Sequence, residues 1–168
     1  MNITFNSAPF SGKVDNSPSL LVGGLNYERK KIRGPRPLSD GSPCINHGCV
    51  LCCKDTEMPL TSLDINRLMK MGFKVKDFVQ EVDGESRLKN KNNTCYFLSE
   101  NLCIAYNVRP KGCRLYPLIF DVDNRIFVFD EFCPFKEEFT FTKNDLNDLK
   151  ALLRRIDRDS IKNTKGRL

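Results

Sequence analysis

Apolar positions at helical spacing predict a helix after Thr61. Thr61 and Asp64 form the pattern of a capping box, in which each side chain bonds the backbone N–H of the other residue. The apolar face that follows consists of Ile65, Leu68 and Met69. Gly72 is expected to end this helix in the left-handed conformation, and Phe73 to fold back onto it.

Two further segments have the same periodicity. Residues 76–82 are expected to form a second short helix with Phe78, Val79 and Val82 facing inward. A second capping box at Thr142 and Asp145 begins the longest predicted helix. Its apolar face consists of Leu146, Leu149, Leu153 and Ile156, and its basic face of Lys150, Arg154 and Arg158. Exposure to solvent explains the basic face more simply than a binding surface does.

Alternation typical of strands occurs in two other places. Residues 94–98 and 102–106 are expected to pair across a turn at 99–101, which brings Cys95 and Cys103 together. Residues 118–122 and 126–132 form a second predicted hairpin, rich in Phe and β-branched residues. The polar residues 83–93 are expected to form a loop, and residues 107–112 a turn or single helical turn before Cys113.

Residues 1–43 are expected to lack long helices and strands, because Gly and Pro recur too often in this stretch. They predict an extended basic arm, followed by one domain over residues 44–168. The arm has a net charge of +3 and residues 143–168 one of +4, whereas the stretch between them has −1. Basic ends can bind nucleic acid, but solvated termini are the commoner explanation, and aromatic residues for stacking are sparse there. A protein partner stays open.

Cysteine is the chemically informative residue of this chain. All eight cysteines lie between positions 44 and 133: Cys44, Cys49, Cys52, Cys53, Cys95, Cys103, Cys113 and Cys133. Thiols this concentrated either crosslink or hold metal. The chain starts without the pattern of a secretory signal and has no membrane-spanning apolar run, so a cytoplasmic location with reduced thiols is expected. A bridge between the adjacent Cys52 and Cys53 would also be strained. Metal ligation is therefore preferred over disulfides or inert thiols.

The identity of the metal is less well determined by the sequence. Structural zinc sites commonly use two separate CxxC pairs as ligands. This chain instead has one dense group of cysteines at positions 44–53, followed by four isolated cysteines. The isolated cysteines, and Pro134 after the last of them, favour an iron–sulfur cluster, such as a 4Fe–4S cluster, over zinc. The patterns together predict a small α+β metal-centred domain with two β-hairpins, two short helices and a C-terminal amphipathic helix.

Several residues near the cysteines are candidates for supporting the centre. His47, the only histidine, is a possible ligand, but with eight thiols available a supporting role is preferred. Arg109 and Arg114 flank Cys113 and can offset the negative charge of bound thiolates, and Tyr116 follows close behind. Ordinary surface charge is the competing explanation for the two arginines.

These motifs resemble the YkgJ-type CxxCxxCC family, whose members are named for zinc or iron chelation. The resemblance covers roughly residues 44–134 and includes the stretches CINHGCVLCC at 44–53, MPLTSLDINRLMKMG at 58–72 and CYFLSENLCIAYNVRPKGCRLYP at 95–117. The gap of four residues between Cys44 and Cys49 departs from the family's usual two.

The resemblance implies metal binding with a structural, accessory or electron-transfer role. Two alternatives from other classes stay open. A larger relative, flagellin lysine N-methylase, has a similar cysteine cluster and implies a protein-modifying enzyme, with Arg109, Arg114 or Tyr116 meeting the substrate. The third possibility is a nucleic-acid-associated zinc module that uses the basic ends.

Overall fold

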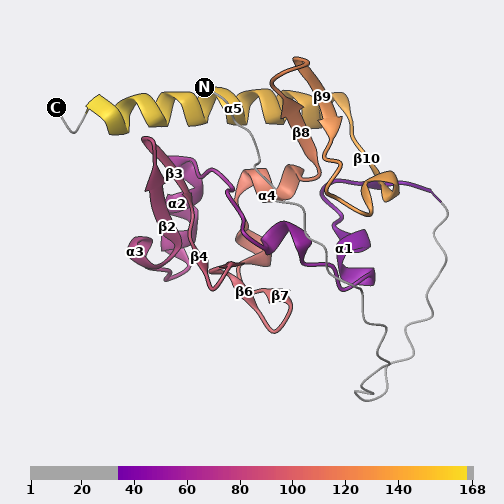
Figure 1. Ribbon diagram of the computed structural model, residues 1–168, viewed down its shortest axis with the longest axis horizontal. Helices are drawn as coiled ribbons and strands as arrows, with labels where there is room; N and C mark the ends of the chain where they lie inside the picture. Colours follow the sequence, from indigo (N-terminus) through magenta and orange to yellow (C-terminus); the bar gives the residue numbers. More distant parts are fainter. Residues whose placement is uncertain (1–33, 166–168) are drawn as a thin grey trace.

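A long C-terminal helix, α5 (Lys143–Lys165), lies along one side of the protein and packs against α4 (Lys111–Leu115) and strand β3 (Glu85–Leu88) (Figure 1). This computed structural model describes residues 34–165. The predicted class is confirmed, since short helices and two-stranded sheets alternate along the chain and α5 closes it. Among residues 34–165, no helix is both long enough and apolar enough to cross a bilayer.

The remaining elements are short. The other helices are α1 (Ser42–Asn46), α2 (Ser62–Lys70) and α3 (Val75–Phe78), with 3₁₀ helices η1 (Leu51–Cys53), η2 (Tyr106–Val108) and η3 (Lys136–Glu138). The other strands are β1 (Arg36–Pro37), β2 (Val79–Val82), β4 (Asn90–Lys91), β5 (Thr94–Cys95), β6 (Leu98–Ser99), β7 (Leu102–Cys103), β8 (Leu118–Asp121), β9 (Ile126–Phe129) and β10 (Phe139–Thr140).

Helix α2 forms as its sequence predicts. The capping box is complete: Thr61 N–H donates to the Asp64 carboxylate (3.1 Å), and Asp64 N–H donates to the Thr61 hydroxyl (3.2 Å). Gly72 ends the helix with a φ of 92°, and Phe73 folds back so that its ring meets Phe97 edge-on. Met69, expected on the buried face, is exposed instead.

The predicted helix over residues 76–82 is wrong. The chain makes one helical turn in α3 and then enters β2, which pairs antiparallel with β3 so that Val79 faces Leu88. The polar loop expected at 83–93 is wrong for the same reason, because it contains β3 and β4. Asp83 and Gly84 form a two-residue turn with positive φ, and this Asp-Gly pair is the hairpin signal that competes with the helical spacing.

Two more hairpins use turns of the same kind. Asn92-Asn93 and Glu100-Asn101 have positive φ at both residues and connect β4 to β5 and β6 to β7. The hairpin predicted across residues 99–101 is therefore confirmed at its turn, but its strands are shorter than expected. Cys95 pairs with Asn90 of β4, whereas Cys103 pairs with Leu98.

The C-terminal half follows its predicted pattern closely. Strands β8 and β9 form the second expected hairpin, with Leu118 opposite Phe129. The capping box of α5 is present, and Thr142 N–H donates to Asp145 at 2.7 Å. At the other end of the described chain, β1 pairs in parallel with β10. The expected features of residues 1–33 lie outside the described residues, so the boundary between arm and domain stays a prediction.

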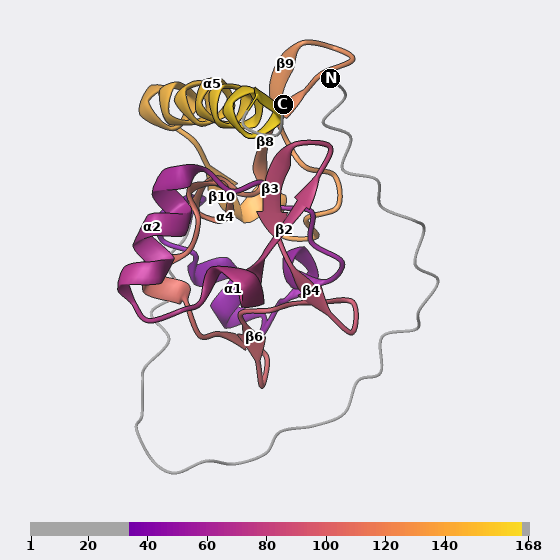
Figure 2. The same cartoon turned by 90° about the vertical axis from the view of Figure 1, so that its left-hand side faces the viewer.

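The buried apolar residues form two cores, and α5 contributes to the first of them. Figure 2 shows α5 lying across the domain, above α2 and β3. The first core is formed by Leu38, Leu115, Leu118, Cys133, Phe139, Leu149, Leu152 and Ile156. The second core is formed by Met58, Leu60, Leu68, Phe78, Leu88, Cys95, Phe97 and Ala105. Each core contains one buried cysteine, Cys133 in the first and Cys95 in the second, so these two thiols are part of the packing of the domain.

Asp64 joins two parts of the second core. Its side chain is 1% exposed, accepts the Lys111 N–H at the start of α4 (3.0 Å), and pairs with Arg67. Replacing it removes a helix cap, typically about 1 kcal/mol, and the buried bond from the Lys111 N–H to a charged group, about 1.5–3 kcal/mol, whereas the pair with the partly exposed Arg67 adds little.

We therefore expect Asp64→Ala to lower the free energy of unfolding by about 2–4 kcal/mol in urea denaturation at fixed metal load. Asp145→Ala is the matched control, because its capping box is solvent-exposed, and it should cost about 1 kcal/mol. Equal losses in the two variants would contradict the bridging role of Asp64.

Candidate metal centre

All eight cysteines are free thiols. Cys44 lies on α1, Cys49 follows α1, Cys52 and Cys53 lie on η1, Cys95 ends β5, Cys103 ends β7, Cys113 lies on α4 and Cys133 follows β9. Short elements that are distant in sequence thus supply the thiols. Six of the eight thiols lie in or against one of the two cores.

The first cysteine group, defined as Cys44, Cys49 and Cys133, lies at the first core. Cys133 is 6% exposed within that core, and Cys44 packs against it. The Cys49 N–H donates to the Cys44 carbonyl at 2.9 Å, which closes the loop after α1 and keeps these two residues adjacent.

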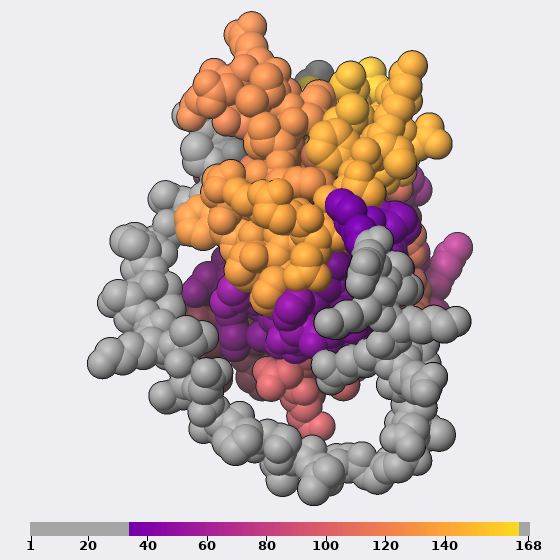
Figure 3. Space-filling model, turned by 90° about the vertical axis from the view of Figure 1, so that its right-hand side faces the viewer, coloured from indigo at the N-terminus to yellow at the C-terminus, as the bar shows by residue number. Residues whose placement is uncertain are grey.

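His47 fastens this loop to the segment that contains Cys133. Its ring stacks on Phe135 with centroids 3.9 Å apart and planes 3° apart, and its Nε2 hydrogen bonds to Glu138 at 2.7 Å. The space-filling view shows residues of the α1 region lying against the segment that leads to α5 (Figure 3). With the ring engaged in this way, a supporting role is favoured for His47.

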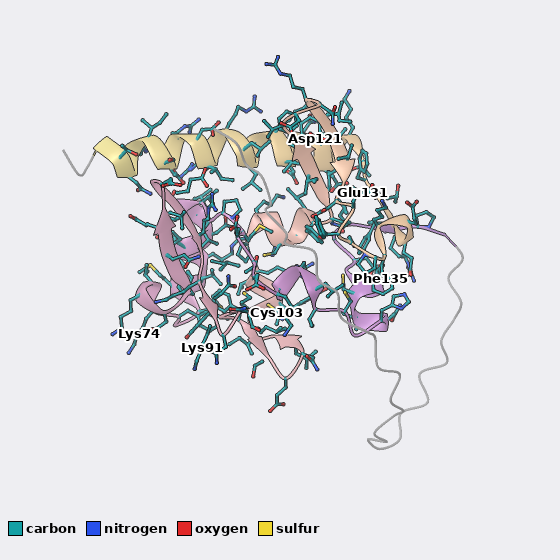
Figure 4. The ribbon with its side chains drawn as sticks, viewed as in Figure 1. Lys74, Lys91, Cys103, Asp121, Glu131 and Phe135 are labelled. Atoms are coloured by element: carbon teal, nitrogen blue, oxygen red, sulfur yellow. The ribbon has the colours of Figure 1, made fainter. Side chains whose placement is uncertain are left out.

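The second cysteine group, defined as Cys53, Cys95, Cys103 and Cys113, lies at the second core. Cys95 is 5% exposed within it, and the other three pack against it. A backbone bridge between Lys54 and Thr94 makes Cys53 and Cys95 neighbours, and the Asp55 N–H donates to Asn93 at 2.9 Å. Figure 4 labels Cys103 near the β6–β7 hairpin, well apart from Phe135 beside α1.

Burial and mutual repulsion favour the neutral thiols within each group. Burial raises the pKa of Cys95 to about 11, and that of Cys113 rises through burial and the nearby thiols of the second group. In the first group, burial raises the pKa of Cys44 to about 11, with smaller contributions from Cys49 and Cys133. A divalent metal ion removes this penalty, because it binds the thiolates and displaces their protons.

Cys52 and Cys53 are adjacent in η1, and each thiol changes the pKa of the other. The Cys52 thiol hydrogen bonds to the Cys53 sulfur, which lowers the pKa of Cys53 and raises that of Cys52. The Cys52 side chain is exposed to solvent.

Arg109 is the candidate cation that the structure places near both groups. Burial raises the pKa of Cys44 and of Cys103, and the Arg109 guanidinium partly offsets the rise at each thiol. The guanidinium lies 4.0 Å from the centre of the Tyr106 ring and donates to the Tyr106 carbonyl at 3.1 Å. Gly41 makes room for this stack, because a Cβ there would meet the Tyr106 hydroxyl at 2.1 Å.

Arg114 and Tyr116, the other two candidates for supporting the metal centre, differ in their surroundings. Arg114 donates to the Asn107 carbonyl at 3.1 Å and its guanidinium is exposed. Tyr116 is partly buried, and burial, Asp130, Cys133 and Cys52 all raise the pKa of its hydroxyl, which places it close to cysteine sulfur. Asp64 was predicted only as a helix cap, yet its carboxylate also raises the pKa of Cys113. No sequence signal distinguishes this second effect from capping.

Chemically, the donor set fits thiophilic metals, because each core has soft thiol ligands in it or packed against it. Among residues 34–165, no three His, Cys, Asp or Glu side chains are arranged to hold one metal ion as they stand. Ligation by three or more thiols thus requires side chains within a group to turn toward one another.

The chain belongs to the CxxCxxCC family, whose model, described as a "Putative zinc- or iron-chelating domain", matches residues 43–134. This match confirms the resemblance drawn from the cysteine motifs and supports zinc or iron chelation. No curated protein and no solved structure is detectably similar to the chain.

Metal affinity should rise with pH, because the thiols of Cys44 and Cys95 are protonated near neutrality, with pKa values of about 11. We expect about a tenfold gain in zinc affinity per pH unit for each proton released. Competition with a chelator at pH 6, 7 and 8, corrected for protonation of the chelator, measures this slope. An affinity independent of pH would mean that the thiols are not the ligands.

Arg109→Gln should weaken metal binding about tenfold, because a cation that favours two thiolates is lost. Arg114→Gln is the matched control and should change the affinity little, since its bond goes to a backbone carbonyl. Both are measured by chelator competition at constant pH. The prediction fails if the two variants are equally weakened.

Proposed function

We propose that this protein binds metal through its cysteine thiolates and that the metal holds the two cores of the domain together. One observation carries the proposal: six of the eight free thiols, supplied by scattered short elements, are packed into or against two apolar cores. Surface thiols without a ligand role would not need to converge in this way. An accessory or electron-transfer role is compatible with the same site.

The fold has few other sources of stability. Every sheet in residues 34–165 has two strands, and several strands have two residues. Isolated two-stranded hairpins are marginal in water, and each core buries only eight residues. Thiolate binding of a structural zinc ion contributes on the order of 10 kcal/mol, comparable to the whole stability of a typical domain. Metal is therefore the proposed crosslink.

An iron–sulfur cluster is the favoured cofactor, and zinc is the second candidate. In the second cysteine group each thiol comes from a different element, and Pro134 follows Cys133, as is common for cluster ligands. Zinc is supported by Cys49 and Cys52, which have the spacing of a zinc knuckle. Either centre leaves excess negative charge on its thiolates, which Arg109 is placed to offset. A reducing cytoplasmic location suits both.

The alternatives from other classes have simple tests. Heat from S-adenosylmethionine binding in calorimetry would favour the protein-modifying enzyme. Retention on heparin or RNA at moderate salt would favour the nucleic-acid module.

Metal analysis of protein purified without oxygen tests the proposal and separates its two cofactors. We expect brown protein with iron and acid-labile sulfide in equal amounts. Colourless protein with bound zinc would select the second candidate, and a sample treated with chelator is the control in both cases. Protein that contains neither metal and retains its fold would refute the proposed function.

A further inference from the structure

Two separate sets of contacts hold the cysteine groups in place. For the first cysteine group, the stacking of His47 on Phe135 and the pairing of β1 with β10 join the segment of Cys44 and Cys49 to that of Cys133. The second cysteine group is closed by the bridge between Lys54 and Thr94 and by the β6–β7 hairpin. Because the two sets share no residue, each group is assembled by its own part of the fold.

The number of thiols matters for what each group can bind. A tetrahedral zinc ion and a 4Fe–4S cluster each take four thiolates. The second cysteine group has four thiols and is complete, whereas the first cysteine group has three. A single centre would use four of the eight thiols and leave the other four without a ligand role.

Cys52 is the remaining thiol, and its position suits the first cysteine group. The Cys52 thiol hydrogen bonds to the Cys53 sulfur in η1, so this pair lies where the two groups adjoin. Cys53 is held at the second core through the neighbouring Lys54–Thr94 bridge. Cys52 lies near Cys44 of the first cysteine group, and near Tyr116, which is also close to Cys133, and the second group already has four thiols without it. It lies near Cys113 too, as expected where two centres adjoin.

We propose that the eight cysteines form two adjacent metal sites, the first made of Cys44, Cys49, Cys52 and Cys133 and the second of Cys53, Cys95, Cys103 and Cys113. This inference rests on the proposed metal binding and adds the number of centres and the ligands of each. The two sites meet at the Cys52–Cys53 pair, and Arg109 stands between them, beside Cys44 and Cys103.

The count of centres is tested by native mass spectrometry of the full chain, purified without oxygen. Two zinc ions or two 4Fe–4S clusters per chain are expected. One centre per chain overturns the two-site inference while leaving metal binding intact. A chain with no metal overturns the proposed function itself, so the two failures are distinguishable.

The division of ligands is tested on the same protein by pulsed alkylation. During slow removal of metal by a chelator, newly exposed thiols are labelled and mapped by peptide mass spectrometry. Labelling should appear in blocks of four that match the two sites. Blocks that mix the groups, such as Cys44 with Cys95, overturn the assignment, and no variant needs to fold for this result.

Paired substitutions give a second test of which cysteines belong to each site. Cys44→Ser with Cys49→Ser, and Cys95→Ser with Cys103→Ser, should each remove half of the metal. Ile45→Ser and Leu102→Ser are the matched controls, because both residues are exposed neighbours of a ligand, and they should keep all of it. Full metal content in either paired variant overturns the assignment of its site.

Discussion

Packing of thiols into two small apolar cores is the constraint on which the rest of this structure depends. Cys95 and Cys133 are buried in their cores, and most of their partners lean against the same surfaces. Desolvation there favours the protonated thiol, so thiolates persist only if a metal ion compensates for the lost hydration. The same sulfur atoms that fill the cores are therefore the atoms that chelation would use, which couples binding to folding.

Local signals account for the elements that could be predicted. The capping boxes at Thr61 and Thr142 and the β8–β9 hairpin depend on neighbouring residues, and each forms as expected. The helix predicted over residues 76–82 does not form, although Phe78, Val79 and Val82 fit a helical face. The β-branched valines and the Asp83-Gly84 turn pair that segment with β3, and the turn was a readable signal.

The cysteines could be identified from the sequence, but their grouping could not. Grouping depends on contacts between distant residues, such as His47 with Phe135 and Lys54 with Thr94. No spacing rule contains those contacts, because they follow from how the short elements pack. Arg109 shows the same limit: its place beside both groups depends on the Tyr106 stack and the room that Gly41 leaves. Family membership adds zinc or iron chelation and leaves the number of centres to the structure.

The central claim is that bound metal holds the two cores together. Hydrogen exchange of the full chain, measured by mass spectrometry before and after anaerobic metal removal, tests it most directly. The account predicts that backbone amides around both cores, including those of α4, β5 and β8, lose their protection together when metal leaves. Unchanged protection in the metal-free protein would contradict it, since the cores would then be stable without their crosslink.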